Sequence, residues 1–182
     1  MLSKTKLIAN PKLKQQLGIA MVEILVTMVI FAIGALGVAS MQITALKFNK
    51  ESSVRSRATL LSLELSDRMR ANMTAVKAGN YTRNYGYTAA VGNIPTAPGC
   101  GSGSECNSTD MATRDLSEWV NDVAKSLPDG AGALVPTANN ATAFNIVVMW
   151  KEKTLVDSSA TDPLCPAPAV VGVRCLNTPF IP

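Results

Sequence analysis

The chain has 182 residues, which is enough for one membrane anchor and one modest domain. Its formal net charge is +4, but the four lysines that precede Gly18 account for all of it, and residues 19–182 carry 13 basic and 13 acidic side chains. A chain that is neutral over this length lacks the basic surface on which nucleic-acid binding depends, so we expect no nucleic-acid contact.

The composition also argues against catalysis. The sequence contains no histidine, so it has no Ser-His-Asp or Cys-His arrangement and no HExxH zinc helix. Acidic pairs such as Glu64 and Asp67 are typical of an exposed helix face. The glycines near residue 100 lack the GxxxxGK[ST] pattern of a phosphate-binding loop. We therefore expect no enzyme activity, no catalytic residue and no cofactor.

Residues 19–46 predict a membrane-spanning helix. Glu23 is the only charged residue among these 28, and a membrane-spanning helix needs about 20 apolar residues. The segment is too long for the apolar part of a secretory signal peptide, which has about 7 to 15 residues. An ordinary single-span anchor explains the length, but it does not explain a carboxylate that costs about 2.5 to 3.5 kcal/mol at the bilayer centre. Glu23 therefore requires a cationic partner.

The residues around Glu23 suggest what that partner is. Gly18, four apolar residues, Glu23 and a long apolar run together resemble the class III signal of type IV pilins and of type II secretion pseudopilins. The resemblance implies that residues 1–18 are a leader, that a prepilin peptidase cuts between Gly18 and Ile19, and that Ile19 is then N-methylated. The family usually has Phe at the position of Ile19. The freed amino group of the same or a neighbouring subunit would pair with Glu23 during assembly.

Residues 47–78 predict an amphipathic continuation of the same helix. No proline lies between Pro11 and Pro95, and apolar residues recur at spacings of three and four, which predicts one apolar stripe along the helix. The stripe consists of Val54, Ala58, Leu61, Leu65, Met69, Met73 and Val76. We expect a folded domain to cover this stripe, the charged residues at 67–70 to form a solvated face, and Gly79 and Asn80 to end the helix.

All four cysteines lie beyond the anchor, within residues 79–182. An even set in a loop-rich segment predicts disulfides in an oxidising compartment. Of the three possible pairings, the shortest closures join Cys100 to Cys106 and Cys165 to Cys175. A zinc site is an alternative, but the sequence lacks close CxxC pairs and histidine, so we expect no metal site. Reduced, inert thiols are the other alternative.

The other patterns in residues 79–182 predict a periplasmic α+β head domain. Turn-forming residues are frequent over 80–109, where we expect one or two short strands followed by a loop. A helix is predicted over 112–125, capped by Asp110 or Thr113. Its apolar face consists of Leu116, Trp119, Val120, Val123 and the following Leu127.

Three further segments predict strands, at 133–135, 143–152 and 170–176. We expect them to form an antiparallel sheet of three or four strands on the amphipathic helix. The class is therefore α+β, and the pilin resemblance implies the same architecture, a long N-terminal helix packed on a small sheet.

Residues 55–72, RSRATLLSLELSDRMRAN, extend the resemblance. Together with residues 34–39, the pair Met41-Gln42 and shorter pieces up to Trp150, they resemble the PilV family of minor pilins. This implies a minor pilin that primes or supports type IV pilus assembly, in a tip complex with other minor pilins, and contributes to twitching motility, adhesion or DNA uptake. The implied partners are the prepilin peptidase, other minor pilins, the major pilin and a PilY-type adhesin.

The location expected for such a chain is the inner membrane, crossed once, and then a pilus on the cell surface. Basic residues flank both ends of the anchor equally, so the positive-inside rule does not set the orientation. The cysteines favour a periplasmic C-terminal domain and a cytoplasmic N-terminus. Two other functions fit the sequence, a GspI-like pseudopilin of type II secretion and a membrane-tethered periplasmic binding domain.

Overall fold

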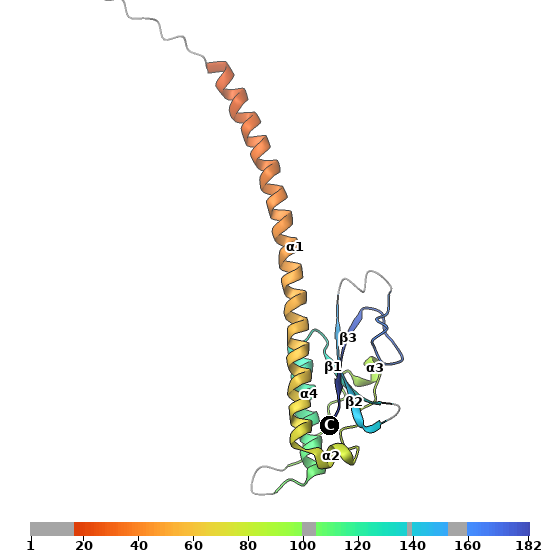
Figure 1. The fold of residues 1–182 in the computed structure, drawn as a ribbon. Helices are drawn as coiled ribbons and strands as arrows, with labels where there is room; N and C mark the ends of the chain where they lie inside the picture. The colour runs from red at the N-terminus through yellow and green to blue at the C-terminus, as the bar shows by residue number, and fades with distance from the viewer. Residues whose placement is uncertain (1–16, 100–104, 138–139, 153–159) are drawn as a thin grey trace, which may run out of the picture. The chain divides into compact units, whose positions relative to one another are not determined.

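The computed structural model describes residues 17–99, 105–137, 140–152 and 160–182. It divides the chain into two compact units, Met1–Asn49 and Lys50–Pro182, which we name the N-terminal unit and the head unit. Helix α1 (Leu17–Ala71) contributes residues to both of them (Figure 1).

The described part of the N-terminal unit is helical throughout. Every large apolar side chain from Met21 to Phe48 is at least 51% exposed, because the described residues of this unit offer nothing for them to pack against. By length and composition, this stretch of α1 is apolar enough to cross a membrane. The structure thus agrees with the long apolar helix predicted from the sequence.

In the head unit, α1 carries the predicted apolar stripe. Ala58, Leu65 and Met69 are completely buried, and Leu61 is nearly so. Val54 and Met73 are partly buried and pack against the same core. The stripe is therefore confirmed, and it forms one wall of the main hydrophobic core.

The single helix predicted to run to residue 78 is interrupted. α1 ends at Ala71, and Asn72, whose φ of −124° and ψ of 55° are not helical, caps a short second helix, α2 (Met73–Lys77), which carries the last two stripe residues, Met73 and Val76.

The end of α2 shortly before Gly79 is as predicted. Gly79 has φ +75°, its N–H donates to Val76 O, and the N–H of Asn80 donates to Ala75 O. These two bonds satisfy helix carbonyls that would otherwise have no partner, and glycine adopts the required left-handed conformation without a Cβ clash.

Helix α4 (Ser108–Ser126) begins one turn earlier than the sequence predicts. The prediction of Asp110 or Thr113 as its cap is wrong, because the side chain of Asn107 accepts the N–H of Asp110 at 2.8 Å and so caps an extra turn. The predicted apolar face is confirmed, since Leu116, Trp119, Val120, Val123 and Leu127 are all buried.

The sheet has three antiparallel strands in the order β1-β2-β3. They are β1 (Ala131–Thr137), β2 (Asn140–Lys151) and β3 (Val173–Phe180). One face of the sheet packs on α1 and α4 and the other on α3 (Tyr87–Ala90) and the segment around Cys165. Because both faces are covered, successive residues of β2 are buried in turn from Phe144 to Trp150, with only Asn145 partly exposed.

The segment that follows α2 differs from the prediction. In the described residues up to Gly99, no strand forms, and the backbone makes only an isolated bridge between Arg83 and Leu134. The chain leaves the edge of β1 after this bridge because it turns at Gly86 into α3. A Cβ atom at Gly86 would lie 2.8 Å from Pro168, so the turn is packed tightly against the loop before β3.

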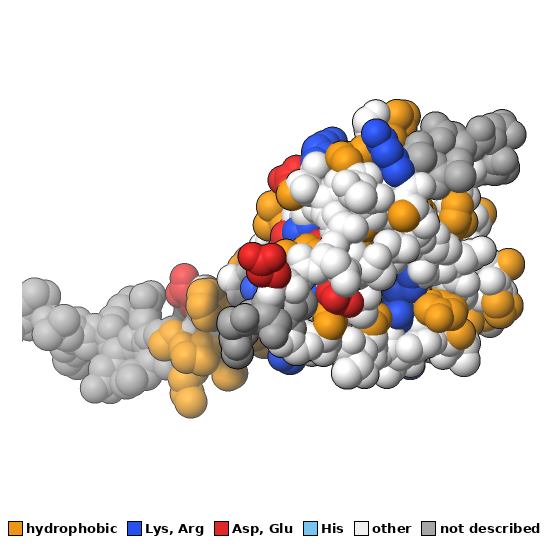
Figure 2. Space-filling view, turned by 90° about the horizontal axis from the view of Figure 1, so that it is seen from below, with side chains coloured by type: hydrophobic (Ala, Val, Ile, Leu, Met, Phe, Trp, Pro, Cys, Tyr) orange, Lys and Arg blue, Asp and Glu red, His pale blue; other side chains and the backbone are white. Residues whose placement is uncertain are grey.

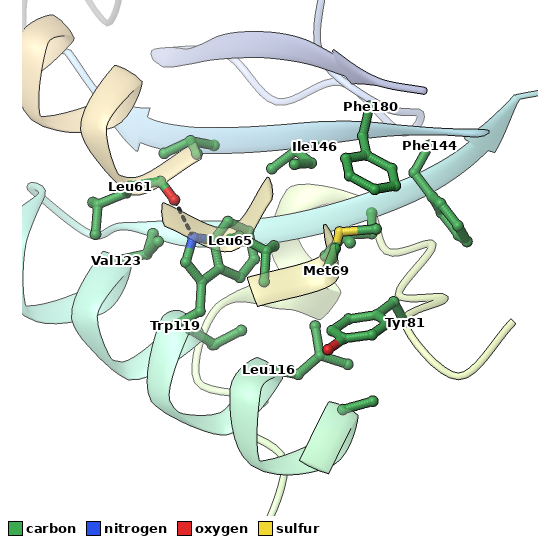
Figure 3. Packing of buried hydrophobic residues seen from close by; sticks show 14 of the residues in the cluster. Leu61, Leu65, Met69, Tyr81, Leu116, Trp119, Val123, Phe144, Ile146 and Phe180 are labelled. Atoms are coloured by element: carbon green, nitrogen blue, oxygen red, sulfur yellow. Dashed lines mark hydrogen bonds between the residues drawn. The ribbon is translucent and has the colours of Figure 1, made fainter. Parts of the chain in front are cut away.

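The main core lies between α1, α4 and the sheet (Figure 3). Trp119 points from α4 into its centre, where its Nε1–H donates to Leu61 O of α1 at 2.8 Å. Leu65 and Met69 of α1 lie between this indole and the sheet residues Ile146 and Phe180. Thr178 of β3 donates to Ser62 Oγ, which adds a polar contact between the sheet and α1.

Gly132 of β1 is required by the indole of Trp119. A Cβ atom at this position would overlap Trp119 Cζ3, and the ring is fully buried and cannot move aside. Gly132→Ala should lower the free energy of unfolding by about 1 to 3 kcal/mol through overpacking. Urea unfolding of the full chain in detergent micelles, followed by tryptophan fluorescence, measures this. Gly99→Ala is the matched control because no atom lies within 4 Å of its added Cβ, and equal midpoints for the two variants would contradict the packing.

Candidate assembly surfaces

The predicted processing site lies at the start of α1. The helix begins at Leu17, so the backbone of Gly18 and Ile19 is in its first turn. Cleavage between these residues and methylation of Ile19 remain predictions.

Glu23 lies one turn further along α1 and is exposed. It is the only charged residue between Ile19 and Leu46, and it makes no ion pair within the described segments of the chain. An unpaired carboxylate on an apolar helix is favourable only if a cation approaches it from outside the helix. The geometry therefore leaves Glu23 available to a partner.

A second exposed surface lies on α1 within the head unit. Leu60 and Leu63 are 66% and 48% exposed, on the side of the helix opposite the buried stripe. Arg57, one turn before Leu60, and Asp67, one turn after Leu63, are also exposed. This face combines apolar and charged side chains that the head unit does not cover.

The same segment of α1 is held against α4 by a group of charges around Arg68. The guanidinium lies 2.7 Å from Glu64 of α1, 2.7 Å from Glu118 of α4 and 3.6 Å from Asp115 of α4. Asp115 also accepts the hydroxyl of Tyr81 at 2.5 Å. One arginine thus joins two helices through three carboxylates.

The pKa values in this group follow from these contacts. Burial disfavours the charged form of Arg68, but its hydrogen bonds to Glu118 and Glu64 outweigh this, and the pKa of Arg68 is raised. The hydrogen bonds from Arg68 and Arg114 lower the pKa of Glu118. Burial, followed by the hydrogen bond to Asp115, raises the pKa of Tyr81. Glu118 and Arg68 are therefore charged, and Tyr81 neutral, at neutral pH.

The charged residues at 67–70 were expected to form a solvated face, and this is correct for Asp67 and Arg70 but not for Arg68. Asp67 and Arg70 are exposed and Met69 points into the core, but Arg68 turns toward α4. Arg68 follows the stripe residue Leu65 by three positions, so it lies at the border of the stripe. The spacing along α1 predicts that Arg68 lies at this border. It does not predict the contact with Asp115 and Glu118, because these residues of α4 come close to Arg68 only in the folded chain.

A second arginine, Arg83, was not identified from the sequence and is 4% exposed. Its Nε–H donates to Gly132 O at 3.0 Å, and its terminal nitrogen donates to the carbonyls of Ala90 and Asn93. Tyr85 stacks on it at 4.9 Å, and among the described residues no acidic side chain forms an ion pair with it. Burial lowers the pKa of Arg83. Its role is to hold the segment after α2 against β1.

The cysteine prediction is confirmed for one pair. Cys165 and Cys175 form a disulfide with a Cα–Cα distance of 5.2 Å. It ties the loop before β3 to that strand, and Asp162 of the loop accepts the N–H of Cys175 at 3.2 Å. Cys100 lies outside the described residues, so its pairing with Cys106 stays a prediction.

The described residues contain no group of three or more cysteine or acidic side chains that could hold a metal ion. On the face of the head in Figure 2, basic and acidic side chains are scattered among uncharged ones, and neither sign dominates it.

Comparison with protein families gives a match to the type IV pilin Tt1218 family model over residues 40–117. The matched range covers the second part of α1, all of α2 and α3, and the beginning of α4. Comparison with curated proteins and with solved structures gave no match. The family match and the α+β fold, a long apolar helix with a small antiparallel sheet, together support a type IV pilin.

Arg68 generates a testable expectation for stability in acid. Arg68→Ala should lower the free energy of unfolding by about 1 to 3 kcal/mol at neutral pH, because it leaves Asp115 without a cation, while solvent screens the more exposed Glu118. Because the pKa of Glu118 is lowered in the folded state, its contribution is present above 4.5 and is lost as the pH falls below that value. Thermal unfolding between about pH 3 and pH 7 measures both effects.

In this experiment, the wild type should lose stability as the pH falls, and Arg68→Ala should lose less. Arg57→Ala is the control, since Arg57 is an exposed arginine of the same helix. A variant at Arg68 that keeps the full acid dependence would show that Glu118 is not stabilised by this arginine.

Proposed function

We propose that this protein is a minor pilin of the PilV type that primes or supports the assembly of type IV pili. Three observations support the proposal. The family match is to a type IV pilin, the fold places a long apolar helix before a small head, and residues 55–72 resemble minor pilins. The observation that carries it is the single exposed carboxylate, Glu23, near the start of an otherwise uncharged helix.

Processing follows from the same proposal. A prepilin peptidase removes residues 1–18, Ile19 becomes the methylated N-terminus, and the new amino group of one subunit pairs with Glu23 of a neighbour. Removal of the leader also removes four lysines, which leaves the mature chain formally neutral. A neutral chain can pack among similar helices without long-range repulsion.

The proposed partners are other minor pilins, the major pilin and a PilY-type adhesin. The chain first resides in the inner membrane, with its head in the periplasm, and later in a tip complex of the pilus on the cell surface. The disulfide between Cys165 and Cys175 supports the periplasmic location of the head, because disulfides persist in oxidising compartments. The proposed outcome for the cell is twitching motility, adhesion or DNA uptake.

Glu23→Leu tests the role of the carboxylate. The variant should insert into the membrane at least as well as the wild type, because it removes a charge that is costly in lipid. It should recover less of its sibling pilins on co-purification, because their amino groups lose their partner. Thr27→Leu is the control, since it changes a polar side chain one turn along the same helix without removing a charge.

Intact mass of both variants should correspond to residues 19–182 with one added methyl group. This check separates a failure of assembly from a failure of processing. Recovery of sibling pilins at the wild-type level by Glu23→Leu would contradict the proposed pairing.

Deletion of the gene tests the function as a whole. Surface piliation, and with it twitching or DNA uptake, should fall while the major pilin remains in the membrane. If the defect is in initiation, blocking pilus retraction in the deletion strain should restore filaments only in part, because rare spontaneous starts then accumulate. Normal piliation with failed protein secretion would indicate a GspI-like pseudopilin, and normal behaviour in both assays would leave a membrane-tethered binding domain.

A further inference from the structure

Arg83 is a buried cation, and among the described residues no acidic side chain forms an ion pair with it. Only 4% of the residue is exposed, and burial lowers its pKa. Arginine nevertheless stays protonated in proteins, so the charge persists. Buried arginines are normally paired with acids, as the partly buried Arg68 is with three carboxylates. The described part of the chain therefore leaves the charge of Arg83 uncompensated.

The hydrogen bonds of Arg83 also leave one nitrogen of the guanidinium unused. Nε–H donates to Gly132 O at 3.0 Å, and Nη2 donates to the carbonyls of Ala90 and Asn93. Nη1 donates to no group of the described residues. This nitrogen is not sealed off from solvent either. Nη1 thus offers two N–H donors at the surface of the head unit.

The backbone on both sides of the guanidinium is held in place. Arg83 exchanges two hydrogen bonds with Leu134 of β1, at 3.1 and 2.8 Å. Residues 90–94 form a tight turn, in which the N–H of Asn93 donates to Ala90 O at 3.3 Å. The position of Nη1 is therefore set before any ligand arrives, and this lowers the entropy that binding costs.

Exposed apolar side chains border the guanidinium. The ring of Tyr85 stacks on it at 4.9 Å and is itself 38% exposed. Val91 and Ile94, which are 43% and 42% exposed, directly follow the two residues whose carbonyls the guanidinium holds. Apolar contacts around an ion pair exclude water and so strengthen it. A free cation with this border is complementary to a carboxylate that has apolar groups on either side.

We propose that Arg83, Tyr85 and the turn at residues 90–94 form a docking site for a segment of a partner protein that inserts an acidic side chain flanked by apolar residues. We name these residues the Arg83 site. The carboxylate accepts the N–H groups of Nη1, and the flanking side chains lie on the ring of Tyr85 and on Ile94. Arg83 keeps its bonds to the three carbonyls, so it holds the head together and binds the partner at the same time.

The charge of the chain favours a single carboxylate over a polyanion. Residues 19–182 carry 13 basic and 13 acidic side chains, so no excess of positive charge surrounds Arg83 to attract a nucleic acid. The Arg83 site lies on the far side of the sheet from α1, next to α3 (Figure 1). It belongs to the head unit alone and does not rest on the proposed function.

Titration of the full chain in detergent micelles with two short peptides tests the Arg83 site. The probes are Val-Glu-Val and Val-Gln-Val, both acetylated and amidated at their ends, so that they differ only by one charge. Carbon-detected NMR of the arginine Cζ and Nε nuclei follows each arginine separately. The Arg83 signal should shift and saturate with the Glu peptide, with a dissociation constant of about 1 mM for so small a contact. The Gln peptide should bind about 10-fold more weakly or worse, because the ionised acceptor is lost.

Other residues of the same chain supply the controls. Arg57 is exposed and forms no ion pair among the described residues, so its signal should change without saturating. Ile94→Ala should weaken both peptides by a similar factor of about 4, the value for one methylene group removed from contact. Leu60→Ala, which shortens an exposed apolar side chain of α1, should leave both affinities unchanged.

Equal binding of the two peptides, no shift at Arg83, or the same saturation at Arg57 as at Arg83 overturns the proposal. Sodium acetate that saturates Arg83 in the same concentration range as the Glu peptide also overturns it, because the site would then bind small carboxylates and not a protein segment. None of these measurements involves pili, so failure here is distinct from failure of the assembly role.

Discussion

The head unit is organised by one requirement, that the apolar stripe of α1 must be covered. A helix with a row of buried residues from Ala58 to Met69 is unstable in water unless other elements remove that row from solvent. One face of the sheet and one face of α4 do this together. Trp119 connects the two coverings, because its ring fills the centre of the core while its N–H satisfies a carbonyl of α1. The polar contact fixes the position along α1 at which α4 packs.

The sheet covers α1 with one face only. Its other face and its two edge strands would be open to solvent and to other chains if irregular segments did not cover them. The bridge at Arg83 pairs with the outer edge of β1, and the guanidinium of Arg83 holds α3 against the far face. At the other edge, Asp162 takes the N–H of Cys175, and Pro179 has no N–H to offer. Open strand edges invite pairing with other chains, so these devices limit such pairing to surfaces outside the sheet.

The sequence predicts the helix faces and the strand that follow from periodicity. It does not predict the side-chain contacts between residues that are far apart in the chain. Apolar spacings of three and four predict the stripe on α1 and the buried face of α4. A continuous apolar run predicts the strand β2. The early start of α4 needs Asn107, a cap that competes with two equally good residues nearby. The roles of Arg68 and Arg83 depend on acids and carbonyls that lie far away in the sequence, Glu118 and Gly132 among them.

The two units differ in how much of their apolar surface they bury and in how many of their charges they pair. The head unit buries most of its apolar residues and pairs most of its charged side chains within the described residues. The N-terminal unit buries none of its large apolar side chains from Met21 to Phe48, each of which gains about 1.5 to 3 kcal/mol on transfer out of water. Lipid can supply that environment, and in the assembly that we propose the helices of other subunits supply it together with an amino group for Glu23. Under this proposal, a move from lipid into a bundle of similar helices keeps the apolar contribution and adds an ion pair, so the free energy of the helix would favour the assembly over the membrane.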